Sequence, residues 1–206
     1  MSTVSAPPLY CNHFWNVKTF NTMILPIYVY GSPVLRKVAR PVEQNEEGLD
    51  EFIDNLWETM YHSDGIGLAA PQVGKSLRIF VIDGSPLEED DSSLKDFKTT
   101  FINPEIIERF SDDKTYEEGC LSIPNLREEI VRPEKVKIRY YDRRFNQHEE
   151  EHTGIAARII QHEFDHLEGI LFTDKLAPLK KRMLRNKLNA IAKGKFEVSY
   201  KVKVAK

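Results

Sequence analysis

Apolar residues recur at helical spacing in three stretches of the chain, and this pattern predicts three helices. The first stretch carries one apolar face over three turns and stops near residues 63–65; its apolar residues are Leu49, Phe52, Ile53, Leu56, Trp57 and Met60. The second stretch includes residues 161–166. The third ends at Gly194 and sets apolar positions among many Lys and Arg: Leu179, Met183, Leu184, Leu188 and Ile191.

Short apolar or alternating runs predict strands around these helices. Residues 77–83 form a continuous apolar run that indicates a mostly buried strand. Further strands are predicted at residues 24–30, 99–102, 104–110, 127–131, 135–141 and 196–202. Strands and helices in this order predict a mixed, mostly antiparallel α+β fold.

The composition fits one globular domain. The chain has 206 residues, 41% of them hydrophobic and 30% charged, with a formal net charge of -3. A slightly acidic whole gives no reason to expect DNA binding. Two cysteines are too few for a disulfide scaffold, which favours a reducing cytoplasm. No apolar run reaches the ~18 residues of a membrane span, so no membrane partner is expected.

The two ends of the chain differ from its middle. Residues 1–22 show no period and contain Pro7-Pro8, so we expect a leader outside the fold, followed by a main unit of residues 23–176. Residues 177–206 are expected to add a basic helix and strand to the same domain. From Lys180 onward, Glu197 is the only acid among ten Lys and Arg. This excess is typical of a solvated face or of a contact with a phosphate-rich partner such as ribosomal RNA.

The second helix carries the first candidate chemistry. His162 and His166 are four residues apart, so they share one helix face, and Glu163 projects beside them. Two imidazoles at this spacing can hold a divalent metal ion while the carboxylate reaches a water on that ion. The same HExxH pattern arises by chance on the wet face of an ordinary helix, which remains the alternative.

Two other stretches bear on this helix. Cys120, in residues 117–124, offers one thiol, and a Cys-His-His set would leave a fourth metal position open; a small buried hydrophobe is the alternative. Residues 65–74 hold three glycines, which would let an extended ligand lie close to the backbone or simply make a tight helix-to-strand connection. They do not form a phosphate-binding loop, because no Gly-Lys-Ser/Thr ending is present.

Together these stretches resemble the peptide deformylases. The motifs are GIGLAAPQVG at residues 65–74, EGCLSIP at 118–124 and QHEFDH at 161–166, in the family's order, and the middle one is similar to the bacterial type-I branch. The resemblance extends over roughly residues 24–174. It implies a fold with sheets packed around a central HExxH helix and a hydrolase that acts on the N-formyl-methionyl end of nascent peptides.

The resemblance also implies the metal and its ligands. One Fe(2+) per chain, replaceable by Zn(2+) or another divalent ion, would be held by Cys120, His162 and His166. Metal-bound water would attack the formyl carbon, and Glu163 would act as general base and then as general acid.

Further residues are implied around the reacting carbon. The Gln72 amide and the backbone N–H of Leu121 would stabilise the oxyanion. Positions that match substrate-binding residues are Ile66, Gly67, Gly119, Arg127, Ile155, Arg158 and Ile159. Two of these stay open: the stem of Arg158 would either wall the methionine pocket or leave its rim open, and Arg127 would either contact the peptide beyond methionine or be an ordinary exposed arginine.

Two other functions fit parts of this sequence pattern. A metallopeptidase that cleaves internal bonds would need a downstream ligand, and no such motif follows His166, although Glu168 and His152 lie near it in sequence. A ribosome-associated binding protein on the same scaffold would need no turnover. The presence of Glu163 and Gln72 together with all three ligand types argues against that function.

Overall fold

The structure, a computed structural model, describes residues 22–205, so the predicted leader lies outside the described residues except for its last residue. Three α-helices are present, as the apolar spacing predicts: α1 (Leu49–His62), α2 (Gly154–Leu167) and α3 (Pro178–Ala192). None of the helices in the described part is long and apolar enough to cross a membrane.

One antiparallel sheet has the order β2-β3-β4-β5-β6. Its strands are β2 (Gly67–Ala69), β3 (Ile79–Asp83), β4 (Lys98–Cys120), β5 (Ile123–Tyr141) and β6 (Gln147–Thr153). Two further short strands, β1 (Ile27–Tyr28) and β7 (Val202–Lys203), pair in parallel and join the two ends of the described chain. The α+β class predicted from the sequence is confirmed.

The strand β3 explains how helices cover both faces of the sheet. All five of its residues are buried. Phe80 and Ile82 belong to the core that includes α2, whereas Ile79 and Val81 belong to the core that includes α1. Because side chains alternate between the faces of a strand, a continuous apolar run is what a strand covered on both faces requires.

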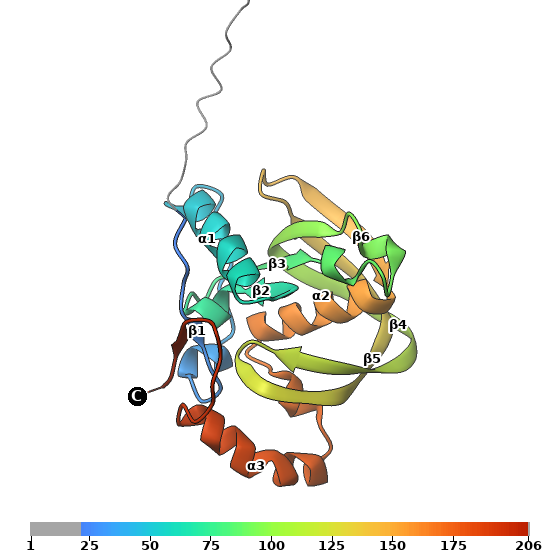
Figure 1. The fold of residues 1–206 in the computed structure, drawn as a ribbon. Coiled ribbons are helices and arrows are strands. Elements are labelled where there is room, and N and C mark those ends of the chain that lie inside the picture. The colour runs from blue at the N-terminus through green and yellow to red at the C-terminus, as the bar shows by residue number, and fades with distance from the viewer. Residues whose placement is uncertain (1–21, 206) are drawn as a thin grey trace, which may run out of the picture.

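The helix α2 lies at the centre of the molecule, and β4 and β5 curve around it (Figure 1). Its apolar residues Ala157, Ile160 and Leu167 are fully buried against the sheet. Its polar side is buried too, because Glu163 is 4% exposed and His166 is 1% exposed. The alternative of an HExxH pattern on the wet face of an ordinary helix is therefore wrong.

Four strands that the sequence predicts as separate are parts of two long ones. Residues 99–102 and 104–110 both lie in β4, and residues 127–131 and 135–141 both lie in β5. Register shifts interrupt their pairing, for example between Ile102 and Glu105 and between Phe110 and Asp113. The polar residues and prolines between the apolar runs therefore cause irregularities that bend the strands without ending them.

Two other strand predictions need correction, and two strands of the structure were not predicted. Within residues 24–30 the strand is limited to Ile27–Tyr28, and near residues 196–202 it is limited to Val202–Lys203. In the described part of the chain, these two pairs of residues form their strand by pairing with each other. The glycine-rich residues 65–74 include the edge strand β2 and a 3-10 turn over Ala70–Val73. No local pattern predicts β6, whose charged residues are typical of an edge strand that avoids further pairing.

The C-terminal elements pack on the hairpin formed by β4 and β5. Leu188 and Ile191 of α3 share a core with Ile123 and Ile130 of β5, on the side of the hairpin away from α1 (Figure 1). Val202 and Val204, near the end of the chain, pack against the same core. Residues 177–205 therefore contact the same sheet that carries the predicted metal ligand Cys120.

The turn that ends α2 depends on a glycine. The N–H of Gly169 donates to the carbonyl of His166, and the N–H of Ile170 donates to that of Asp165, which is a Schellman motif. Gly169 has φ of +69°, and a Cβ there would lie 2.8 Å from the carbonyl carbon of Arg36. Gly48, before α1, also has a positive φ of +72° but has open space around it.

These two glycines form a matched test of the α2 end. Gly48→Ala should lower the free energy of unfolding by about 1–2 kcal/mol, the cost of the left-handed conformation alone. Gly169→Ala should lower it further, because the added methyl also meets the backbone of the segment that contains Arg36. Urea unfolding of both variants measures the difference, and equal losses would contradict the close approach.

Candidate metal centre

Cys120, His162 and His166 bring three metal-binding atoms together in one place. Cys120 is the last residue of β4, and the two histidines stand one turn apart on α2. One ligand atom from each residue lies within 4.8 Å of the others, and the Cys120 Sγ and His166 Nε2 are 3.3 Å apart. The helix provides two of these atoms because its histidines are four residues apart. The third atom comes from a strand that is distant in sequence.

These distances fit a tetrahedral metal ion. Bond lengths of ~2.3 Å to sulfur and ~2.0–2.1 Å to nitrogen place neighbouring ligand atoms about 3.5 Å apart. Both histidine rings are almost fully enclosed, since His166 is 1% exposed and the His162 side chain 11%. The mixed thiol and imidazole donors suit Fe(2+) or Zn(2+) better than Mg(2+) or Ca(2+).

Glu118 fixes the orientation of the His162 ring. Its Oε2 is 2.9 Å from the Nδ1 of His162. Burial alone would raise the pKa of Glu118, but hydrogen bonds from Arg132 and His162 hold it well below its usual range. The carboxylate is therefore an acceptor, so Nδ1 of His162 carries a proton and Nε2 faces the cluster.

The electrostatics of the cluster favour positive charge. Burial lowers the pKa of His162, but its contacts with Cys120 and Glu118 outweigh burial and raise that pKa to about 10. The pKa of His166 lies well below its ordinary value, because burial and the charge of His162 both disfavour a second proton. The two neighbouring histidines therefore do not both carry a positive charge.

Glu118 and Arg132 form a buried ion pair behind the histidines. The Nε and Nη2 of Arg132 donate to the two carboxylate oxygens of Glu118 at 2.7 and 2.9 Å. The Nη1 of Arg132 donates to Asp165 of α2 at 2.6 Å. All three side chains are 5% exposed or less, so these bonds are shielded from water. The pair ties β4 to β5 and both strands to α2.

Glu163 lies in the cavity beside the three ligand atoms without a fixed partner. Its Oε2 is buried and, among the described residues, meets no hydrogen-bond donor. Burial raises the pKa of Glu163 to about 7, against the opposing charge of His162. A carboxylate with a pKa near neutrality can both accept and release a proton, as a general base and acid must.

Gly67 makes room for this carboxylate. A Cβ at Gly67 would lie 2.6 Å from Oε1 of Glu163, closer than real Cβ contacts allow. Gly67 is the first residue of the edge strand β2, so the strand passes directly over Glu163. The glycine is therefore needed for the close approach of the strand to the helix.

Gln72 is held with its amide nitrogen toward Cys120. Its Oε1 accepts from the N–H of Ala69 at 2.8 Å. Its Nε2 lies 3.5 Å from the Cys120 Sγ and 3.3 Å from the Ser122 Oγ, and the residue is 2% exposed. The glutamine thus presents a fixed N–H donor beside the cluster.

The turn between β4 and β5 lies next to this amide. It contains Leu121 and Ser122, directly after Cys120. The N–H of Tyr30 donates to the Ser122 carbonyl at 2.8 Å, and the Tyr200 hydroxyl donates to the Leu121 carbonyl at 2.9 Å. The backbone of the turn is therefore anchored by segments near both ends of the described chain.

These groups face a cavity of about 560 Å³. Every site residue predicted from the sequence except His166 lines it: Ile66, Gly67, Gln72, Gly119, Cys120, Leu121, Arg127, Ile155, Arg158, Ile159, His162 and Glu163. The cavity runs between β2, the end of the β4–β5 hairpin and α2, and its size suits a short extended peptide.

The two arginines with open roles differ in burial and in the number of their contacts. Arg158 is 7% exposed, and its guanidinium donates to Glu118 and to the carbonyls of Ile130 and Lys114 at 2.6–2.9 Å. These bonds fix its stem in the cavity wall, which favours a walled pocket. The Arg127 side chain is 64% exposed and pairs with Glu117 at the cavity mouth.

The two residues that could give an internal-bond metallopeptidase a further ligand lie apart from the cluster. Glu168 accepts from Arg78 at 2.7 Å. His152 lies on β6, with its Nε2 3.2 Å from Glu150. Neither belongs to the cluster of potential ligands in the described residues.

Sequence reasoning missed three residues of this site. Glu118 stands two residues before Cys120 on the same strand, so its side chain points to the same face, and this alternation was an available signal. Arg132 and Tyr200 reach the site from β5 and from the C-terminal segment, and no local pattern marks either of them.

Known proteins are similar to this chain in sequence. The family described as Polypeptide deformylase matches residues 24–182 of the chain. Among curated relatives, the peptide deformylase of Christiangramia forsetii is 48% identical over 188 residues, which cover 88% of this chain and 96% of the relative.

Solved structures share the fold. A peptide deformylase from Legionella pneumophila is 40% identical with a TM-score of 0.72, covering 83% of this chain and 96% of its own. The class I type b peptide deformylase of Acinetobacter baumannii bound to Met-Ala-Ser is 35% identical with a TM-score of 0.68, covering 75% and 99%. This chain therefore belongs to the polypeptide deformylase family, metal-dependent hydrolases that remove the N-formyl group from newly synthesised peptides.

Proposed function

We propose that Cys120, His162 and His166 hold one divalent metal ion per chain, Fe(2+) in the native protein, with Zn(2+) or another divalent ion able to replace it. The observation that carries this proposal is the convergence of the three ligand atoms beside the unpartnered carboxylate of Glu163. The thiol donor supports iron or zinc, and Glu118 supports the Nε2 of His162 as the ligand atom.

Glu163 is proposed as the group that moves the proton. When bound, the metal supplies a Lewis acid that polarises the formyl carbonyl and lowers the pKa of water. Glu163 accepts the proton of the attacking water and delivers it to the departing amine nitrogen. Its burial and its pKa near 7 support both halves of this transfer. Water therefore adds to the formyl carbon, the C–N bond breaks, and formate and a free amino terminus are released.

Gln72 and Leu121 are proposed to stabilise the negative charge on the formyl oxygen. The Nε2 of Gln72 is already fixed beside Cys120, so little reorganisation is needed during the reaction. Leu121 follows Cys120 directly, so its N–H originates next to the same ligand. Two donors at one oxygen would form an oxyanion hole.

The cavity supports binding of an extended formyl-methionyl peptide. Gly67 lies on an edge strand and Gly119 near the end of β4, so a peptide can approach both backbones closely. Ile66, Ile155 and Ile159 are proposed to hold the methionine side chain, with the stem of Arg158 as one wall. Arg127, at the mouth, is proposed to contact the next residues. The similar Acinetobacter enzyme is bound to Met-Ala-Ser, which supports a short peptide as the occupant of this cavity.

The cytoplasm and the ribosome are proposed as the setting, because formylated nascent chains emerge there. Residues 177–206 are proposed to belong to the catalytic domain, supported by the packing of Leu188 and Ile191 on β5. The exposed residues Arg182 and Arg185 of α3 would offer positive charge to ribosomal RNA.

Glu163→Ala and Cys120→Ala test the proposed site. With formyl-Met-Ala-Ser, Glu163→Ala should lower kcat by about 10²–10⁴-fold and keep one metal per chain, because it removes only the base. Cys120→Ala should lose the metal itself. Metal analysis beside the deformylation assay separates the two, with Glu168→Ala, at the C-cap of the same helix, as a control carboxylate. An empty site in Glu163→Ala, or cleavage of internal bonds by the native protein, would contradict the proposal.

Gln72→Leu tests the oxyanion donor. Loss of the N–H should lower kcat by about 10²–10³-fold and leave KM nearly unchanged, because the bond forms mainly in the transition state. Steady-state kinetics and metal content measure this. Gln72→Glu, which keeps an acceptor for the N–H of Ala69, controls for the lost backbone contact and should be similarly slow. Native kcat in Gln72→Leu would remove Gln72 from the mechanism.

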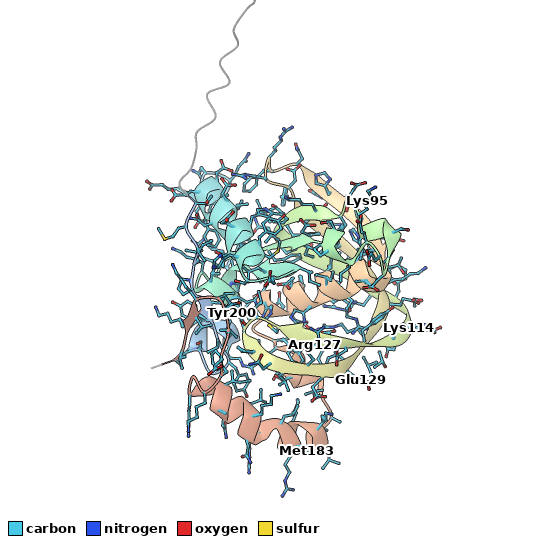
Figure 2. All side chains as sticks on the ribbon, viewed as in Figure 1. Lys95, Lys114, Arg127, Glu129, Met183 and Tyr200 are labelled. Carbon is cyan, nitrogen blue, oxygen red and sulfur yellow. The ribbon has the colours of Figure 1, made fainter. Side chains whose placement is uncertain are left out.

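The ribosome contact is tested by charge reversal on α3. Arg182→Glu with Arg185→Glu should weaken co-sedimentation with ribosomes on the order of tenfold and lower its salt dependence. Lys95→Glu with Lys114→Glu changes the net charge equally at residues far from α3 (Figure 2) and serves as the control. Both double variants should deformylate free peptide at the native rate. Equal sedimentation of the two would leave α3 as a solvated basic face.

A further inference from the structure

The segment after α3 returns to the cavity. The N–H groups of Ile27 and Val29 donate to the carbonyls of Lys201 and Lys203 at 2.9 and 3.1 Å, which fixes the end of the segment beside β1. Before these bonds, the Asn125 amide donates to the Glu197 carbonyl at 3.3 Å. Residues 198–200 are therefore held from both sides.

Alternate side chains of this segment point inward. Phe196, Val202 and Val204 pack on the core that contains α3, and Tyr200 packs on the core that contains α1. Val198 and Tyr200 also line the cavity. Although this segment lies beyond the residues matched by the family, 24–182, it forms part of the cavity wall.

Tyr200 is the residue of this segment that contacts the reacting region. Its hydroxyl donates to the carbonyl of Leu121 at 2.9 Å, and Figure 2 shows Tyr200 beside the turn that joins β4 and β5. This bond is half-buried, so water replaces it less readily than at an open surface. It joins residues 79 positions apart in sequence.

The bond constrains the peptide groups on both sides of Leu121. The Tyr200 hydroxyl holds the Leu121–Ser122 peptide group, and Tyr30 holds the next one through the Ser122 carbonyl. The Leu121 N–H belongs to the preceding peptide group, whose other residue, Cys120, would be fixed by metal ligation. The side chain is confined as well, because a Cβ at Gly65 would lie 2.9 Å from Cδ1 of Leu121. The two peptide groups meet at the Cα of Leu121, so the contact with the carbonyl limits the rotation about φ and ψ that would turn the Leu121 N–H away.

We propose that Tyr200 is a positioning residue for deformylation, whose hydroxyl holds the Leu121 carbonyl and, through the Cα that joins the two adjacent peptide groups, keeps the Leu121 N–H aimed at the formyl oxygen. The C-terminal segment is thereby part of the active site as well as of the core. This inference rests on the proposed role of Leu121 as an oxyanion donor. It requires no change in metal binding, because Tyr200 contacts the turn through a carbonyl and not through a ligand.

Tyr200→Phe tests the inference because it deletes the hydroxyl and keeps the ring in the core. With formyl-Met-Ala-Ser, kcat should fall roughly three- to tenfold with KM unchanged, the size expected for one partly buried hydrogen bond that matters mainly in the transition state. Metal content should stay at the native value, and the melting temperature should fall no further than in a control that loses a comparable hydroxyl. Tyr140→Phe is the matched control, because its hydroxyl, 3.2 Å from Glu150, is also partly buried but lies outside the cavity.

A second change separates the inference from the role of Leu121. Replacing Leu121 by its α-hydroxy acid analogue turns the Cys120–Leu121 amide into an ester and deletes only the N–H. This variant should be slow, and adding Tyr200→Phe to it should lower kcat no further, because both changes act on one donor.

The outcomes are distinct. Native kcat in Tyr200→Phe, or a loss of metal or melting temperature that accounts for the lower activity, would overturn the inference while leaving the ester result to decide the role of Leu121. Native kcat in the ester variant would overturn the proposed role of Leu121 and, with it, the route through which Tyr200 acts. Additive losses in the combined variant would show that Tyr200 acts elsewhere.

Discussion

The buried bond between Glu118 and Arg132 is the interaction on which the site depends. Glu118 accepts from Arg132, from Arg158 and from His162, so one carboxylate connects β4, β5 and α2. A buried ion pair is weak evidence for stability, because desolvation can cancel its attraction, whereas removal of one partner leaves an uncompensated charge. Its value here is geometric: the pair that joins the sheet to the helix also orients the His162 ring.

In this arrangement the carboxylate of Glu163, which is proposed to carry the proton, has no structural role. Glu118 joins β4 and β5 to α2 and orients the His162 ring, whereas Glu163, one residue after His162, has a carboxylate oxygen without a donor in the described residues and a pKa raised to about 7. Two buried carboxylates near the same histidine thus differ because one is surrounded by guanidinium groups and the other is not. The contrast between a low and a raised pKa is what separates a fixed acceptor from a proton carrier.

The strands show where local patterns fail. Apolar periodicity located α1, α2 and α3 well, because a helix buries one face through spacing that is written within a few turns. The strands β4 and β5 were divided too often, because their register shifts depend on the partner strand and not on local composition. No local pattern predicts the charged strand β6. Its seven mostly polar residues are extended because they pair with β5 at the edge of the sheet.

The sequence by itself determined the groups whose geometry is local: His162, Glu163 and His166 share a helix face because the backbone repeats every 3.6 residues. Through the resemblance of three motifs it also placed Cys120 and Gln72 near them. Only the tertiary structure decided that Glu118 orients His162, that Arg158 is fixed in the cavity wall and that Tyr200 reaches the Leu121 carbonyl. These contacts join residues 40 to 79 positions apart, and contacts across such separations follow from how the sheet bends around α2. No periodicity within one segment carries that information.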